Sequence, residues 1–218
     1  MLSSRRIGDD LYLVNGFTAT VDGLNSAAET DEELLKNYLT ILDTPTQDLM
    51  PKIYFDGDEG RALNQANDCM IPQNATDKDG YSHILSVIRI NMSDLSDISA
   101  TCISAKAEVM YMSQDNLYLA SSYDNQTVLH KVALDNGLSY QATGSVPGVI
   151  GWRSAPNLRL SEFDGYLRIV SSDYTSGEPE HHLSVLQQQA EQLTVVGSLP
   201  NEQHPEPIGK PGEDVYAV

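Results

Sequence analysis

Basic side chains are scarce in this sequence. It has 13 Lys and Arg residues against 31 Asp and Glu residues, which gives a formal net charge of −18 at pH 7. Nucleic acids and anionic membranes attract proteins through Lys and Arg, so the charge argues against both as partners. A large negative charge commonly serves solubility alone, and a site for cations or basic partners is the rarer alternative.

Long apolar runs are also missing. No uninterrupted apolar segment approaches the roughly 18 residues of a membrane-spanning helix. The first seven residues, MLSSRRI, lack the apolar core of a secretion signal. The sequence therefore predicts no transmembrane segment and no export signal within this chain.

The common catalytic motifs are absent as well. The sequence contains no Gly-x-Ser-x-Gly nucleophile elbow, no glycine-rich phosphate loop and no His-Glu-x-x-His pair. No catalytic residue is predicted. Cysteine is rare too: Cys69 and Cys102 are compatible with one disulfide or with two buried thiols, and neither belongs to a Cys-x-x-Cys pair.

What the sequence does contain is short strands. Residues 109–113, 117–122, 127–134 and 138–145 are rich in β-branched and aromatic side chains. Asp, Asn, Gly and Ser residues separate them, and the last break contains Asn136-Gly137, a pair suited to a tight hairpin. This spacing predicts one antiparallel sheet of four strands.

The four-stranded unit recurs along the chain. NLYLA at residue 116 matches DLYLV at residue 10, an offset of 106 residues, and GSVP at residue 144 matches GSLP at residue 197, an offset of 53. A period near 50 residues with four strands per unit is typical of β-propeller blades. The downstream copy is expected at residues 158–200, in a sheet separate from the preceding one.

The upstream copy is interrupted. Its first two strands are expected within residues 4–21 and its last two at 84–92 and 98–104, with an insertion between them. Thr30 followed by three acidic residues predicts a helix start, and Pro45 predicts its end near Asp43. Leu34, Leu35, Tyr38, Leu39 and Leu42 give this helix an apolar face.

Several segments resemble one protein family. They are EVMYMSQDNLYLA (residues 108–120), GSVPG (144–148), SEFDGYLRI (161–169), SSRRIG (3–8) and DCMIP (68–72). The chain is similar to secreted bacterial and archaeal proteins with a C-terminal β-propeller domain, which are distantly related to WD repeats. The match is spread over most of the chain, and its Tyr-Leu-Arg segment is the most specific part.

The resemblance implies an extracytoplasmic location, whether secreted, periplasmic or lipoprotein-anchored, and a Cys69–Cys102 disulfide. It also implies that this chain is the middle of a longer protein with further blades. A truncated propeller would expose apolar flanks, so self-association of the chain is a further expectation. The resemblance transfers no catalytic residue.

Two acidic loops invite a calcium interpretation. Asp56, Asp58 and Glu59 form the first candidate site, and residues 77–80 form the second, because calcium binds several carboxylate and carbonyl oxygens. Neither loop has the full spacing of a calcium-binding loop of about twelve residues, so solvated turns are the alternative. No other cofactor is predicted.

Other candidate residues are few. Trp152 and Arg153 lie in a loop between blades and are the candidate binding residues, with packing between blades as the alternative. Glu178, Glu180, His181 and His182 could bind a metal, although adjacent strand residues face opposite ways. Tyr111, Tyr118 and Tyr166 are predicted to pack between blades.

The sequence thus predicts an all-β chain, a partial β-propeller of about three four-stranded antiparallel blades plus a helix/loop insertion in the first blade. The expected bounds are residues 1–21 and 83–105 with the insertion at 22–82, then 108–148, 157–201 and the start of a next blade at 214–218. We expect an extracytoplasmic, non-enzymatic scaffold that binds an unknown protein or glycan. A metal-dependent propeller hydrolase or lyase acting on an extracellular polymer is the alternative.

Overall fold

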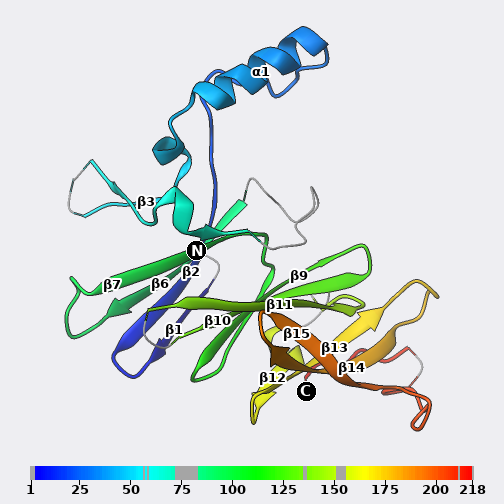
Figure 1. The fold of residues 1–218 in the computed structure, drawn as a ribbon. Coiled ribbons are helices and arrows are strands. Elements are labelled where there is room, and N and C mark those ends of the chain that lie inside the picture. Colours follow the sequence, from blue (N-terminus) through cyan, green and yellow to red (C-terminus); the bar gives the residue numbers. More distant parts are fainter. Residues whose placement is uncertain are drawn as a thin grey trace.

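The computed structural model describes residues 3–55, 57, 59–71, 83–134, 137–150, 156–210 and 212–217. Within them the chain forms sheets of mainly antiparallel strands, and the helix α1 (Asp31–Asp43) stands apart from the strands (Figure 1). The all-β, partial-propeller fold with an insertion in the first blade is confirmed.

The first sheet contains one strand more than predicted. Its order is β1 (Ser3–Ile7), β2 (Asp10–Thr18), β6 (His83–Asn91), β7 (Ile98–Ser104) and β5 (Cys69–Met70). The first four strands are antiparallel neighbours, whereas β5 comes from the insertion and lies parallel to β7. The expected outer strand β7 is therefore covered on its edge.

Two further units follow as antiparallel meanders. The first consists of β8 (Val109–Met112), β9 (Asn116–Tyr123), β10 (Gln126–Ala133) and β11 (Ser139–Pro147). The second consists of β12 (Leu160–Phe163), β13 (Tyr166–Asp173), β14 (Glu180–Gln189) and β15 (Gln192–Leu199). Their tight turns use residues that tolerate positive φ, such as Asn125 at 58° and Gly165 at 77°.

The two meanders are not fully separate sheets, which corrects the prediction. Strands β11 and β15 meet in parallel at one pair, Thr143 and Gln192, so the order runs β12-β13-β14-β15-β11-β10-β9-β8. Gly144 makes this approach possible, because a Cβ atom there would lie only 2.3 Å from the Leu193 carbonyl oxygen. Each meander keeps its own internal hydrogen bonds.

The apolar core lies between neighbouring units. Leu117 and Leu119 belong to the cluster that β9 shares with the first sheet, whereas Tyr118 and Ala120 belong to the cluster shared with β12–β15. Since alternate residues of a strand point to opposite faces, both faces of the middle unit are buried. Packing of consecutive units against each other therefore stabilises the partial propeller.

The insertion follows β2 and holds α1, the 3-10 helices η1 (Thr46–Leu49) and η2 (Ala66–Asp68), and the two-stranded sheet β3 (Lys52–Ile53) and β4 (Arg61–Ala62). A capping box formed by Thr30 and Glu33 begins α1, and the helix ends at Asp43 ahead of Pro45, as predicted. Among the described residues, no helix combines the length and apolar character needed to cross a bilayer.

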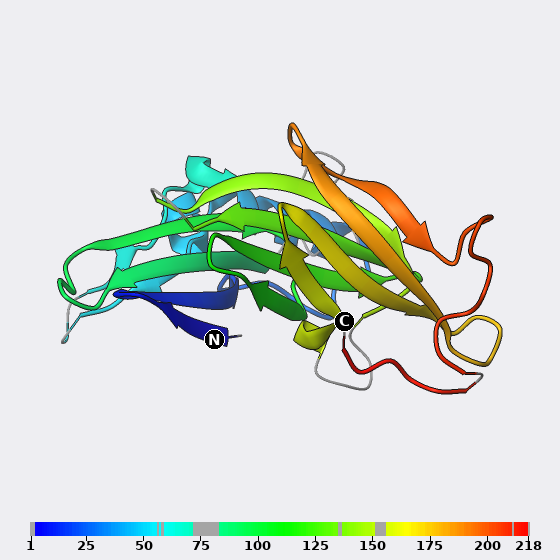
Figure 2. The same ribbon diagram turned by 90° about the horizontal axis from the view of Figure 1, so that it is seen from below.

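The chain termini lie on the same side of the strands in Figure 2. Between β12 and the meander β8–β11 lies the 3-10 helix η3 (Pro156–Arg159). Residues 214–217, where the first strand of a further blade was predicted, have no regular secondary structure. Ala217 nevertheless lines the same groove as Ser3 of β1 and Ser161 of β12, so this segment runs toward those two strands.

Candidate interaction surface

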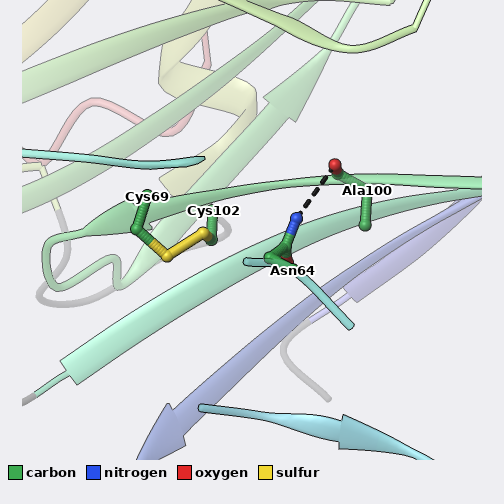
Figure 3. Close-up of a disulfide and its surroundings, with 4 residues drawn as sticks. All are labelled: Asn64, Cys69, Ala100 and Cys102. Atoms are coloured by element: carbon green, nitrogen blue, oxygen red, sulfur yellow. Dashed lines mark hydrogen bonds between the residues drawn. A yellow bond between two sulfur atoms is a disulfide. The ribbon is translucent and has the colours of Figure 1, made fainter. Parts of the chain in front are cut away.

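Residues 64–70 of the insertion, which we call its root, are attached to β7 of the first sheet. Cys69 and Cys102 form a disulfide with their Cα atoms 4.6 Å apart, which confirms the pairing that the family resemblance implied. The buried Asn64 side chain donates from Nδ2 to the Ala100 carbonyl at 2.9 Å, on the same strand as Cys102 (Figure 3). The insertion is therefore held at two points.

The helix α1 turns its polar side toward its own chain. The preceding segment runs back along the helix, where Asn25 N–H donates to Asn37 Oδ1 at 2.9 Å and Asn37 Nδ2 donates to the Asn25 carbonyl at 2.8 Å. Asn25 Nδ2 also donates to Glu33 Oε1 at 3.3 Å. These hydrogen bonds cover the polar side, so the opposite side faces outward.

That outward side is the apolar one. Six large side chains form it, and all are exposed; Leu35, Tyr38 and Leu42 are 56%, 58% and 61% exposed. The full set is Leu34, Leu35, Tyr38, Leu39, Ile41 and Leu42. We call these six residues the α1 stripe. A surface helix normally buries such a stripe against its domain, whereas no residue of α1 is buried.

Local interactions hold α1 in helical form without that packing. Hydrogen bonds from the backbone N–H and hydroxyl of Thr30, and from the backbone N–H of Glu29, lower the pKa of Glu33. The carboxylate is thereby kept ionised at the positive end of the helix dipole. The first turn is preformed even though the α1 stripe has no partner among the described residues.

A second apolar feature lies at the β3–β4 hairpin. A groove of about 760 Å³ is lined by Ile53, Phe55, Glu59, Gly60, Arg61, Leu95 and Ser96. The Arg61 guanidinium lies 4.8 Å from the centre of the Phe55 ring, and Leu95 is 63% exposed. We call this the hairpin groove; like the α1 stripe, it belongs largely to the insertion.

A polar cluster joins the two meanders. Glu162 Oε1 accepts hydrogen bonds from Tyr118 Oη at 2.9 Å and Asn116 Nδ2 at 2.8 Å, and Glu162 N–H donates to Tyr111 Oη at 3.0 Å. The Lys131 ammonium lies 5.9 Å from the centre of the Tyr118 ring. Packing between blades, predicted for Tyr111 and Tyr118, is confirmed; Tyr166 is exposed, so its prediction is wrong.

This cluster predicts a loss of stability at alkaline pH. Burial, and then the Glu162 carboxylate, raise the pKa of Tyr118 far above its ordinary 10.0. An unfolded Tyr118 loses its proton above pH 10 while the folded one keeps it, so unfolding becomes easier as pH rises. We expect a loss of about 1.4 kcal/mol per pH unit above that point from this group.

The measurement is urea denaturation between about pH 9 and pH 11 for the wild type and Tyr118→Phe. The variant should lose about 1 kcal/mol at pH 9 through its missing hydrogen bond, and its stability should then fall less steeply. Burial also raises the pKa of Tyr12 and Tyr140, so part of the slope should remain. Identical slopes would contradict the assignment.

His181 is a structural residue rather than an exposed metal ligand. Its Nε2 donates to the Glu213 carbonyl at 2.7 Å, which leaves Nδ1 to accept from the Ser172 hydroxyl at 2.8 Å. The buried Arg159 donates to the same hydroxyl at 2.8 Å. This series of hydrogen bonds attaches residue 213 to β13 and β14. His182, the next residue of β14, faces the opposite side of the sheet.

Most of the predicted binding and calcium residues belong to parts of the chain that the structure does not describe. Trp152 and Arg153, Asp56 and Asp58, and the loop 77–80 lie outside the described residues. Glu59, the third calcium candidate, is exposed and lines the hairpin groove. Within the described ranges, no group of three His, Cys, Asp or Glu residues could hold a metal ion. The calcium site stays a prediction.

The sequence did not reveal the hairpin groove or the outward orientation of the α1 stripe. The apolar spacing of α1 was visible, but spacing does not tell which way a helical face points. One sequence pattern is consistent with an exposed stripe: charged residues border it at both ends, namely Asp31, Glu32 and Asp43. No sequence pattern indicates the hairpin groove, because β3 and β4 have two residues each and such short strands show no periodicity.

Comparison with known protein families supports the propeller fold. The pattern of the family described as "Beta propeller domain" matches residues 1–218, the whole chain. The chain belongs to the beta propeller domain family. No curated protein and no solved structure matches this propeller chain.

Proposed function

We propose that this propeller chain is a non-enzymatic, extracytoplasmic scaffold that binds a protein partner through its insertion. The observation that carries the proposal is the outward α1 stripe on a helix whose polar side is covered by its own chain. Contiguous exposed apolar side chains are typical of protein interaction sites. The hairpin groove adds a second exposed apolar surface to the same insertion.

The fastening of the insertion supports a binding role. The Cys69–Cys102 disulfide and the Asn64–Ala100 hydrogen bond hold the root of the insertion on the first sheet. A fixed root reduces the conformational entropy that binding would cost. The disulfide also supports the extracytoplasmic location, because disulfides persist in oxidising compartments.

The test is site-specific photo-cross-linking in cells that produce the protein. A photoreactive residue placed at Tyr38 or at Tyr54, both exposed on the insertion, is expected to give a discrete cross-linked protein. The same residue at Phe163, which is 70% exposed on β12, serves as the control. Cross-links confined to Phe163 would overturn the proposal, as would recovery of the protein in the cytoplasm with reduced cysteines.

A further inference from the structure

We propose that the α1 stripe docks into an apolar groove of a partner protein whose rim carries Lys and Arg side chains. This inference rests on the proposed function, which it deepens by naming the element that binds and the chemistry of the partner. It draws on three observations: the inverted polarity of α1, the spacing of the stripe and the charge around it.

The polarity of α1 is inverted, because its polar side is covered by the chain and its apolar stripe is exposed. Asn25 and Asn37 exchange two hydrogen bonds on the polar side, and a Cβ atom at Gly23 would lie 4.0 Å from Thr40 Cγ2 on that same side. The segment before α1 therefore covers the polar side of the helix and leaves the α1 stripe exposed. Figure 1 shows α1 projecting beyond the strands.

The spacing of the stripe suits a groove. Counted from Leu34, its residues fall at positions i, i+1, i+4, i+5, i+7 and i+8, which places them on one continuous side of the helix. Amphipathic helices that bind in grooves use anchors at this spacing. A groove would cover the whole stripe, whereas a flat surface would contact only its centre.

The charge around the stripe selects the partner. Residues 22–49 contain seven acidic side chains and one basic one, Lys36. Asp31 and Glu32 lie at one end of the stripe and Asp43 at the other. Complementary charge favours a partner with Lys and Arg around the groove, since opposite potentials speed association and like charges across an interface are costly.

The same charges argue against a second copy of the chain as the occupant. Two α1 helices packed antiparallel would bring Asp31 and Glu32 of one copy beside Asp43 of the other, and parallel packing would bring the two acidic first turns together. Each copy also carries a net charge of −18. An anionic membrane surface would repel the helix for the same reason.

The test uses three fluorescent helical-hairpin peptides as probes, because two packed helices present a groove that a single helix lacks, and the full chain as the receptor. One peptide has a leucine stripe with lysine on its other side, the second has glutamate in place of lysine, and the third has the residues of the first in an order without a stripe. We expect the striped lysine peptide to bind about tenfold or more tightly than either other peptide in fluorescence anisotropy.

The receptor variants locate the binding. Leu35→Gln with Leu39→Gln keeps good helix formers in α1 and is expected to weaken binding about 30-fold or more, as loss of central apolar anchors does. Phe163→Gln, which removes an exposed ring from β12, is the matched control and should stay within about twofold. Glu32→Gln with Asp43→Asn should weaken binding severalfold and reduce its salt dependence.

The remaining outcomes separate the two proposals. Sedimentation equilibrium that shows a dimer dissociated by Leu35→Gln with Leu39→Gln would name a second copy as the occupant and overturn the basic partner. Binding lost with Phe55→Gln but kept in the α1 variant would move the site to the hairpin groove; the inference would fall and the insertion would keep its binding role. Binding that no insertion variant changes would overturn both.

Discussion

Replacing Gly144 by Ala is expected to destabilise the protein by about 2–3 kcal/mol, because the new methyl group meets backbone atoms. Its Cβ atom would lie 2.3 Å from the Leu193 carbonyl oxygen and 2.7 Å from Leu193 Cβ. A backbone carbonyl cannot rotate away as a flexible side chain can. Strands β11 and β15 would have to separate at the pair that joins the two meanders.

The repeat supplies a matched control for this substitution. Gly197 stands at the corresponding position of the next unit, in GSLP against GSVP, yet its Cβ atom would lie 4.0 Å from Val185 Cβ. Gly197→Ala should change the free energy of unfolding by no more than about 0.5 kcal/mol, and can stabilise a strand by lowering the entropy of the unfolded chain. Urea denaturation of both variants checks the difference, and equal effects would contradict the junction described above.

Removing the disulfide is expected to have the largest effect. Cys69→Ala with Cys102→Ala opens a loop that spans 33 residues, and the lost restriction of the unfolded chain corresponds to about 3–4 kcal/mol. The strand β5 should also detach from β7, since it pairs there through only two residues. We therefore expect both a lower global stability and an insertion that proteases cut more readily.

Urea denaturation and limited proteolysis measure the two consequences separately. Asn64→Ala is the control, because it removes the other attachment of the insertion and should cost only about 1 kcal/mol. Reduction of the wild type should reproduce the behaviour of the double alanine variant. An unchanged midpoint after cysteine removal would show that the disulfide does not restrict the unfolded chain.

The sequence predicted the parts of the fold that local chemistry decides. Turn residues such as Asp164-Gly165 and alternating apolar residues located the strands, and Thr30 and Pro45 located the ends of α1. These signals work because each one fixes the backbone within a few residues of itself.

The features that the sequence missed depend on distant parts of the chain. β5 has two residues, and its only strand partner among the described residues is the distant β7, to which the disulfide also joins it. Tyr166 matches Tyr118 in residue type, yet it begins its strand next to a turn and stays exposed. The apolar face of α1 was predicted, but its outward direction depends on hydrogen bonds with Asn25 that no periodicity reveals.

The interruption of the first blade has a consequence for the order in which the protein folds. Strands β9 and β10 are joined by a two-residue turn and can pair as soon as both have been synthesised. Strands β2 and β6 must instead meet across residues 19–82, and the entropy of closing a long loop slows such pairing. We expect the middle blade to act as the template on which the amino-terminal blade closes last, although its first strands leave the ribosome earliest.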